Sequence, residues 1–428
     1  MIHKKRLVYN TFLLTGVSLL MSCIGIAFQV WLVGRIGSAG IGLYQLVLSV
    51  TGLMATFAVS GIRFASTRLI SEELGGYSCG SIRPAMTRCL AYGLLFGAAA
   101  GAVLWLGDAR TVRSLRLSAV SMPCISLCAS LSGYFTACGR VWKPSLVHLI
   151  EQLAGIALVA ACLARVPRAD IELSCAAVTA GRVTADILSL GLMFAVYLHD
   201  RRAHYGEACR GTRLTARMLK IALPLAVSAY ARSALTTLQN LLVPRGLRSA
   251  GYSADGALSG YGTIQGMVLP IIFFPSCIMS AAAELIVPEL TEAQVQRSGA
   301  EIRAVTRRMF ILSAEFSALV ALFLFLFSDM LGLAIYKSHA AGHYIRILAP
   351  LVPVMYTDMS IDGCLKGLGQ QVWSMGINIL DALTGLLLVW WLLPRYALAA
   401  YIGIIYFTEI LNFALSLARL RRALRTAV

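Results

Sequence analysis

The sequence predicts an all-α integral membrane protein whose twelve transmembrane helices form two parallel six-helix bundles. Three observations predict this fold class: the composition, the number and length of the apolar runs, and an internal repeat. Hydrophobic residues make up 58% of the 428 residues and charged residues only 13%. This balance leaves too little polar surface to cover a water-soluble globule of this length.

Twelve apolar runs are each long enough to cross about 30 Å of hydrocarbon as a helix. They lie at residues 7–33, 41–62, 89–107, 117–138, 146–164, 173–198, 219–243, 258–283, 308–328, 345–365, 372–393 and 398–418. Six runs in each half give both halves the same orientation, so the repeat is expected to be parallel. We therefore predict three parts: an N-terminal bundle (1–200), a cytoplasmic basic linker (201–218) and a C-terminal bundle (219–428).

The repeat is clearest where residues 141–159 and 372–389 form two copies of one helix. With a one-residue gap, the alignment pairs Trp142 with Trp373, Glu151 with Asp381 and Gly155 with Gly385. Prolines precede both copies at matching places, namely Pro123 in one half and Pro350 with Pro353 in the other. Duplication of this kind is typical of secondary transporters, whose binding sites lie between the halves.

The formal charge is +17, and the Lys and Arg residues behind it are concentrated in alternate loops instead of forming one basic face. If the N-terminus is cytoplasmic, 24 of the 37 Lys and Arg residues lie in inner segments, 10 in outer loops and 3 within helices. This split predicts that both termini are cytoplasmic, and it argues against a nucleic-acid partner. We read the stretch after Lys4-Lys5-Arg6 as an uncleaved first helix in a bacterial cytoplasmic membrane. The eleven cysteines are expected to be packing residues, with no metal site.

A charge at mid-bilayer costs about 3 kcal/mol on insertion scales, so each one needs a partner, water or a role. Arg182 and Asp186 lie four residues apart, so their side chains share one helix face. We expect a structural ion pair, with a functional role as the alternative.

Arg232 lies about eleven residues into the run at 219–243, which contains no acidic residue. Its neighbours in the sequence are hydroxyl and amide residues: Tyr230, Ser233, Thr236, Thr237 and Asn240. A guanidinium presents a planar pair of donors that matches phosphate, so we expect Arg232 to bind an anionic group in a hydrated cavity. The alternative is an ion pair with Asp358 or Asp381.

Four acidic residues form a candidate set for coupling to H⁺ or Na⁺: Asp358, Asp362, Asp381 and Glu151. Asp358 and Asp362 are four residues apart and place two carboxylates on one helix face. The alternative is that their repulsion keeps one of them protonated, with no coupling role. Glu409 is a further acid near the midplane.

Several motifs resemble the stage V sporulation protein B family of polysaccharide and lipid-linked oligosaccharide flippases. In the first half they are residues 34–45 (GRIGSAGIGLYQ), 59–62 (VSGI) and 68–72 (RLISE). In the second half they are residues 222–224 (ALP), 242–245 (LVPR), 261–262 (YG), 266–270 (GMVLP), 274–275 (FP) and 287–293 (VPELTEA). The resemblance extends over nearly the whole chain, and the block at 261–293 is its most specific part.

The resemblance implies the fold of the multidrug/oligosaccharidyl-lipid/polysaccharide exporter superfamily, with two bundles around a central cavity, and alternating access of an undecaprenyl-linked substrate. The partners expected are therefore a lipid-linked glycan and membrane lipids, and the protein is expected to be a monomer. Besides Arg232, the residues expected to contact substrate are Arg35, Arg63, Arg245, Gln29, Asn240 and Gln265. Gln29 stands where relatives often carry arginine.

Two other functions stay open: a cation-coupled multidrug exporter of the same superfamily, and a non-transporting membrane scaffold. Such an exporter is expected to use an acid in its first helix, and residues 7–33 contain no Asp or Glu. An enzyme is not expected, because the longest predicted outer loop, about residues 329–344, holds one acid and two histidines. We expect no catalytic residues and no cofactor, and the sequence has no nucleotide-binding Gly-x4-Gly-Lys-Ser/Thr motif.

Overall fold

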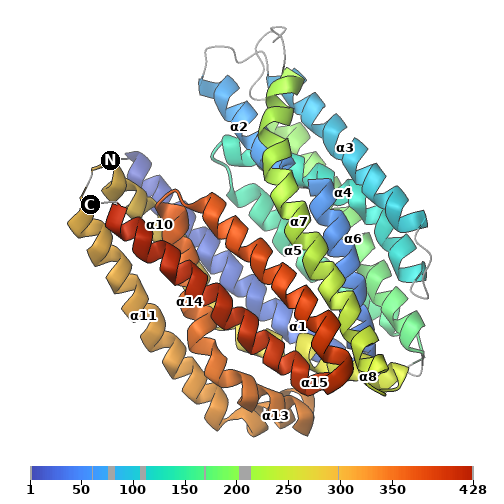
Figure 1. Ribbon diagram of the computed structural model, residues 1–428. Helices are drawn as coiled ribbons and strands as arrows, with labels where there is room; N and C mark the ends of the chain where they lie inside the picture. The colour runs from blue at the N-terminus through green and yellow to red at the C-terminus, as the bar shows by residue number, and fades with distance from the viewer. Residues whose placement is uncertain are drawn as a thin grey trace. The chain divides into compact units, whose positions relative to one another are not determined.

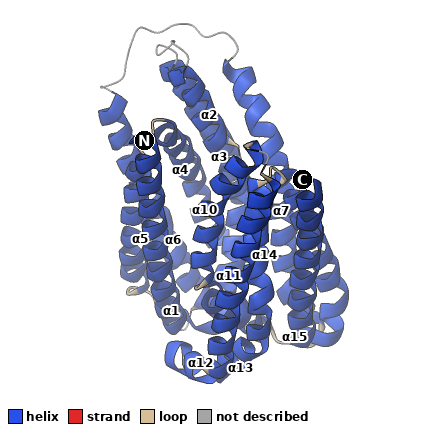
Figure 2. Cartoon of the chain, turned by 90° about the vertical axis from the view of Figure 1, so that its left-hand side faces the viewer, coloured by secondary structure: helices blue, strands red, loops and turns tan. Residues whose placement is uncertain are grey.

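The structure is a computed structural model that describes residues 2–59, 61–75, 82–106, 112–167, 170–201, 214–296 and 298–426. Within these ranges every regular element is a helix and no strand occurs (Figure 2). The all-α fold class is therefore confirmed. Most of the predicted basic linker, residues 202–213, lies outside the described residues, so the predicted division into bundles stays a prediction.

The helices of the first half are α1 (Ile2–Val59), α2 (Ile62–Gly75), α3 (Ile82–Leu106), α4 (Val112–Ala137), α5 (Trp142–Leu163) and α6 (Ile171–Arg201). Those of the second half are α7 (Leu214–Ser249), α8 (Ala254–Gly262), α9 (Leu269–Phe273), α10 (Ser276–Val295), α11 (Gly299–Leu326), α12 (Ser328–Tyr336), α13 (His339–Leu348), α14 (Val352–Gly367) and α15 (Gln371–Thr426). A π-helical turn, η2 (Thr263–Val268), joins α8 to α9, and a 3-10 turn, η3 (Ala349–Leu351), joins α13 to α14.

The longest helices, α1 and α15, each contain one residue that turns the chain. Gly37 has a φ of 74° in α1, and Ala397 has a φ of 51° in α15. Glycine adopts a positive φ at no steric cost, whereas alanine does so only under strain, three residues after Pro394. Figure 1 shows the second arm of α15 running back toward the C-terminal end of the chain. Both turns fall where the sequence separates two predicted spans.

Eight described helices are long and apolar enough to cross a membrane, and two of these, Leu20–Ser71 and Gln371–Arg425, each contain two predicted spans. The other two predicted spans, at 219–243 and 345–365, coincide with α7 and with α13 followed by α14. Helices of the described residues thus account for all twelve predicted spans. The predicted outer loop at about 329–344 is instead mostly helical, in α12 and α13.

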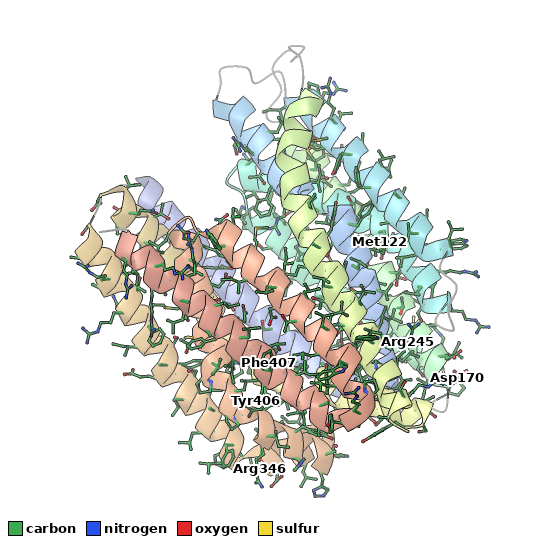
Figure 3. The ribbon with its side chains drawn as sticks, viewed as in Figure 1. Met122, Asp170, Arg245, Arg346, Tyr406 and Phe407 are labelled. Carbon is green, nitrogen blue, oxygen red and sulfur yellow. The ribbon has the colours of Figure 1, made fainter. Side chains whose placement is uncertain are left out.

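Polar side chains fix several helix starts by accepting the N–H groups that have no partner within the helix. Asp170 Oδ1 accepts the N–H of Leu173 at 2.9 Å and begins α6 (Figure 3). Serine hydroxyls do the same before α8, α11 and α13 at Ser253, Ser298 and Ser338.

The chain divides into two compact units. Unit 1 comprises Met1–Val17 and Leu46–Thr237, and unit 2 comprises Ser18–Gln45 and Leu238–Val428. Unit 1 therefore contains the first two thirds of α7, and unit 2 contains residues 18–45 of α1, which lie on both sides of Gly37. In each unit a buried apolar cluster holds the helices together, around Leu131 and Phe135 in unit 1 and around Leu290 and Leu365 in unit 2.

The repeat is visible in the backbone of α4 and α14. Counted from Pro123, a glycine follows at +10 (Gly133) and another at +16 (Gly139); counted from Pro353, the same offsets give Gly363 and Gly369. Gly139 and Gly369 end their helices with almost identical φ values of 69° and 70°. A left-handed residue at this place favours glycine, so α4 and α14 end with the same type of C-cap.

Candidate functional site

Unit 1 contains a cavity of about 200 Å³ with several charged and polar side chains in its mainly apolar lining, which we call the unit 1 cavity. Helices α1, α2, α4, α5 and α6 contribute its lining residues: Val59, Arg63, Ile125, Cys128, Ala129, Ser132, His148, Glu151, Asp186 and Ser189. The structure thus brings together three residues that the sequence assigned to different roles. Arg63 was predicted to bind substrate, Glu151 to couple ions and Asp186 to pair with Arg182.

Glu151 is held by two side chains on the cavity wall. Its Oε2 atom accepts a hydrogen bond from Ser189 Oγ at 2.6 Å and lies 3.2 Å from His148 Nδ1. Ser189 is buried, whereas His148 is half exposed. The Glu151 carboxylate therefore has a fixed position, and one of its two partners, His148, is half exposed.

Close packing of α5 on α6 decides where the Arg182 guanidinium lies. A Cβ atom at Gly155 would lie 3.7 Å from Arg182 Nη1, so the arginine lies over the glycine. Arg182 interacts electrostatically with both Asp186 and Glu151. The predicted two-residue pair is therefore part of a three-residue charge group that α5 and α6 share.

Unit 2 contains three acids on α14 and the two arms of α15, namely Asp358, Asp381 and Glu409, which we call the unit 2 acidic cluster. Glu409 interacts electrostatically with both Asp381 and Asp358. Asn412 Nδ2 donates to Asp358 Oδ2 at 3.0 Å. No three His, Cys, Asp or Glu side chains in the described ranges are grouped to hold a metal ion.

The polar residues of the unit 1 cavity and the unit 2 acidic cluster occupy related places in the repeat. Asp381 is the counterpart of Glu151 in the alignment of residues 141–159 with 372–389. Asp358 lies five residues after Pro353, and Cys128 of the unit 1 cavity lies five residues after Pro123. Each half therefore places a polar group among its fourth, fifth and sixth spans.

Asp362, the fourth acid of the predicted coupling set, has a different environment from Asp358. It forms an ion pair with Lys366, four residues on, at 2.6 Å, and it accepts a hydrogen bond from Ser374. A cation therefore balances Asp362, whereas Asp358 accepts a hydrogen bond from the neutral amide of Asn412.

Arg232 lies at the middle of α7 with an exposed side chain. Three neighbours on α7 bond the second arm of α1: Tyr230 donates to Phe57 O at 3.0 Å, Ser233 to Thr56 Oγ1 at 3.4 Å and Thr237 to Ser49 O at 3.0 Å. The polar face expected from the sequence thus joins two helices of unit 1. Within the described part of unit 1, Arg232 has no ion-pair partner.

The remaining predicted substrate residues occupy several environments. Gln29 donates to Gly266 O at 3.0 Å, and Gln265 donates to the Tyr401 hydroxyl at 2.7 Å, so both amides serve packing within unit 2. Arg35 and Asn240 are half-buried. Arg245 is exposed, about one turn before the end of α7 (Figure 3).

Sequence reasoning missed His148, Ser189 and Asn412 as members of the polar groups. The signal was present for His148, because it precedes Glu151 by three residues and so lies on the same helix face. Ser189 and Asn412 gave no signal, because their roles depend on contacts between helices.

Residues 7–282 match the profile of a family described as "Polysaccharide biosynthesis protein", and residues 248–391 match the profile described as "MatE". The chain is 23% identical over 406 residues to Stage V sporulation protein B of Bacillus subtilis (strain 168), covering 90% of this chain and 78% of the relative. It is 19% identical over 382 residues to Sporulation protein YkvU of the same organism, covering 86% of each chain.

Solved structures share the fold at low sequence identity. An inward-facing multidrug resistance MATE family transporter of the MOP superfamily superposes with a TM-score of 0.70 at 13% identity, covering 95% of this chain and 96% of that one. A MOP superfamily transporter from Pyrococcus furiosus, described as having a binding pocket of reverse polarity, gives a TM-score of 0.66 at 13% identity, covering 99% and 96%. These similarities bear on the fold alone.

Proposed function

Because the chain belongs to the polysaccharide biosynthesis protein family, we propose that it is a flippase that moves an undecaprenyl-linked oligosaccharide or cell-wall precursor across the cytoplasmic membrane by alternating access. The chain is a multi-pass membrane protein with the fold of the MOP superfamily transporters. The diphosphate of the substrate would be bound by arginine, while the lipid tail stays in the bilayer.

One observation supports this proposal most directly: an exposed guanidinium at the middle of a 36-residue helix. Arg232 lies 18 residues from the start of α7, which corresponds to about 27 Å along the helix axis. A charge at that depth is costly in lipid unless an anion or water reaches it. The hydroxyl of Ser233 is next to it, and Arg63 of the unit 1 cavity is a second cation for the same class of ligand.

The rival function is export of cationic drugs coupled to H⁺ or Na⁺. The unit 2 acidic cluster favours a cation-coupled transporter of either kind, because Asp358 accepts a hydrogen bond from a neutral amide and interacts electrostatically with two further acids, Asp381 and Glu409. The lack of Asp and Glu in residues 7–33 and the exposed Arg232 favour an anionic substrate. Drug export is therefore the second candidate.

The test is a leaflet assay in vesicles that contain the purified protein and a fluorescent undecaprenyl-diphosphate sugar, whose outer-leaflet copies are quenched by dithionite. Wild type should bring the whole pool within reach of the quencher, whereas empty vesicles should protect about half. Arg232→Ala should lose most of this activity, and Arg232→Lys should keep part of it, because lysine restores charge without the bidentate donor pair.

Arg165→Ala is the matched control, because Arg165 is also exposed but lies two residues after the end of α5. All variants must give the same size-exclusion profile as wild type. Full activity of Arg232→Ala would make this residue structural. Absence of flipping by wild type, together with ethidium export in the same vesicles, would favour the drug exporter, and absence of both activities would favour the scaffold.

A further inference from the structure

One membrane span in each unit is broken where its apolar sequence continues. In unit 1, α1 ends at Val59 and α2 begins at Ile62, with Gly61 at a φ of 79°. In unit 2, α9 ends at Phe273 and α10 begins at Ser276, and here only the hydrogen-bond ladder is interrupted, because Phe274 and Pro275 keep helical φ values of −59° and −67°. We call these places the unit 1 break and the unit 2 break. They interrupt the second and eighth of the twelve spans, which are counterparts in the repeat.

A helix that ends inside a membrane leaves its last carbonyl groups without helical partners, and each such group must find another donor. At the unit 1 break, Ser126 Oγ donates to Ala58 O at 2.8 Å and the Tyr230 hydroxyl donates to Phe57 O at 3.0 Å. At the unit 2 break, the Tyr356 hydroxyl donates to Ile272 O and Ser276 Oγ donates to Phe273 O at 2.7 Å. Hydroxyl groups therefore cap both breaks.

The principal caps come from equivalent positions of the repeat. Ser126 lies three residues after Pro123 on α4, and Tyr356 lies three residues after Pro353 on α14. Both side chains are fully buried. On the other side, Gly93 of α3 approaches Ser126 so closely that a Cβ atom there would lie 3.1 Å from the Ser126 hydroxyl. The hydroxyl is therefore fixed between two helices.

The part of each span that follows the break is packed tightly on the helix that supplies the cap. A Cβ atom at Gly133 of α4 would lie 2.7 Å from Arg63 O on α2, and Thr67 Oγ1 donates to Gly133 O at 3.2 Å. A Cβ atom at Gly363 of α14 would lie 2.7 Å from Ala283 Cβ on α10. Such close approach of backbones fixes α2 on α4 and α10 on α14.

The part of each span that precedes the break is packed on a different helix. The second arm of α1 bonds α7 through Tyr230, Ser233 and Thr237. In unit 2, a Cβ atom at Gly262 of α8 would lie 2.1 Å from Ser38 O on α1. Each broken span thus has one half fixed to α4 or α14 and the other fixed to α7 or α1.

Free space lies beside one of these breaks. Val59 and Arg63, which flank the unit 1 break, both line the unit 1 cavity of about 200 Å³. Close-packed interiors resist movement, so a cavity at a break permits a change of angle that would otherwise produce clashes.

We propose that the two breaks are matched hinges of the transport cycle and that Ser126 and Tyr356 are positioning residues that hold each hinge in one of its angles. This proposal rests on the proposed transport function, but the hinge itself is measurable without substrate. During transport, the second arm of α1 would move with α7 relative to α2 and α4, and the Ser126 bond to Ala58 O would form in one state only. The Tyr356 bond would do the same in unit 2.

The first experiment measures the unit 1 hinge alone. Spin labels replace Leu48 and Phe64, two exposed residues on either side of the break, in a variant without the native cysteines. Double electron–electron resonance spectroscopy in lipid nanodiscs should give two distances between the labels. The double variant Ser126→Ala, Tyr230→Phe should change the ratio of the two populations. A single distance that the double variant leaves unchanged would overturn the hinge.

The second experiment measures amide hydrogen exchange. Loss of one capping bond should speed exchange in residues 52–64 for Ser126→Ala, and in residues 268–278 for Tyr356→Phe, by about fivefold. The controls are Ser130→Ala, whose hydroxyl bonds α3 and its own helix, and Tyr406→Phe, whose hydroxyl bonds Ile347 O. Neither control should change exchange at a break, and equal effects of controls and caps would contradict the proposal.

The transport assay separates positioning from a merely structural role. Ser126→Ala and Tyr356→Phe should change kcat and leave KM for the lipid-linked sugar unchanged, because neither residue is proposed to touch the substrate. Faster exchange with unchanged kcat would make the caps structural. If wild type does not flip the lipid-linked sugar, the proposed function fails, whereas the spin-label distances still decide whether the hinge exists.

Discussion

Asp200, at the end of α6, shows how a single buried carboxylate joins three elements. Its side chain is 3% exposed and forms ion pairs with Arg140 and Lys143, which lie between α4 and α5 and at the start of α5. The Tyr134 hydroxyl donates to its second oxygen at 3.3 Å. The carboxylate is therefore the common acceptor for two cations and a phenol.

Replacing Asp200 by Asn should destabilise unit 1 by about 2 kcal/mol, because charged hydrogen bonds to a buried acceptor are lost. The measurement is the Tm of the purified protein in detergent. Asp329→Asn is the matched control, because Asp329 pairs with Arg346 at 2.7 Å with both side chains about half exposed. Exposed pairs contribute little, so the control should leave Tm unchanged. Equal shifts in both variants would mean that burial does not strengthen the Asp200 contacts.

A second residue-scale prediction separates the two acids of α14. Asp358→Asn should abolish the response of flipping to an imposed H⁺ or Na⁺ gradient, because Asp358 faces a neutral amide in the unit 2 acidic cluster. Asp362→Asn should keep that response, because Lys366 already balances Asp362. The measurement is the initial flipping rate with and without each gradient. Loss of the response in both variants would contradict this distinction.

At the residue scale, the sequence predicted which charged residues lie within spans but not which of them interact across helices. Arg182 and Asp186 share a helix face, so spacing alone placed them together. Their electrostatic interaction with Glu151 depends on how closely α5 approaches α6 at Gly155, and no spacing within one helix gives that distance. The roles of the individual site residues stay predictions.

At the scale of elements, hydropathy predicted the helices well and their interruptions poorly. An apolar run shows that a segment lies in lipid, but the run continues through Gly61 and through Phe274-Pro275, where the helices break. The second span was expected to end at residue 62, yet α2 continues helical to Gly75. The breaks are hard to see in the sequence because hydroxyls of other helices, from Ser126, Tyr230 and Tyr356, satisfy freed carbonyls together with the local Ser276 hydroxyl.

Glycines at helix contacts give the element-scale prediction. Gly133→Ala should destabilise the protein by about 1–3 kcal/mol, because its Cβ atom would lie 1.8 Å from Ser66 Oγ and would force α4 away from α2. Gly191→Ala on α6 is the control, because no atom lies within 4 Å of a Cβ there and alanine favours helix. Tm should fall for Gly133→Ala and hold or rise for Gly191→Ala. A fall for both would point to a general intolerance of substitution.

For the whole molecule, the sequence was most informative about duplication. The pairing of residues 141–159 with 372–389 is matched by equal offsets in α4 and α14 and by the φ values of Gly139 and Gly369. What the repeat did not predict is the exchange of helices between units, in which unit 1 includes the start of α7 and unit 2 includes part of α1. The order of helices along the chain defines the two sequence halves, whereas the packing of helices in space defines the two units.

Orientation in the membrane is a further property of the whole molecule, and the distribution of charge predicts it. With 24 Lys and Arg residues in the inner segments and 10 in the outer loops, both termini are expected in the cytoplasm. The segment 251–255, which includes the start of α8, should then be outside, and its residues are exposed in the structure. Residues 201–213 should be inside, and Arg210 is chosen there from the sequence alone.

Single cysteines at Tyr252 and Arg210, in a variant without the eleven native cysteines, test this orientation. A membrane-impermeant maleimide added to intact cells should label Tyr252→Cys and not Arg210→Cys, because the bilayer shields the inner loop. Both should react after the cells are permeabilised, which excludes burial as the cause of protection. Labelling of Arg210→Cys from outside would invert the orientation. Because a flippase carries its substrate from the leaflet where it is made, that result would also reverse the proposed direction of transport.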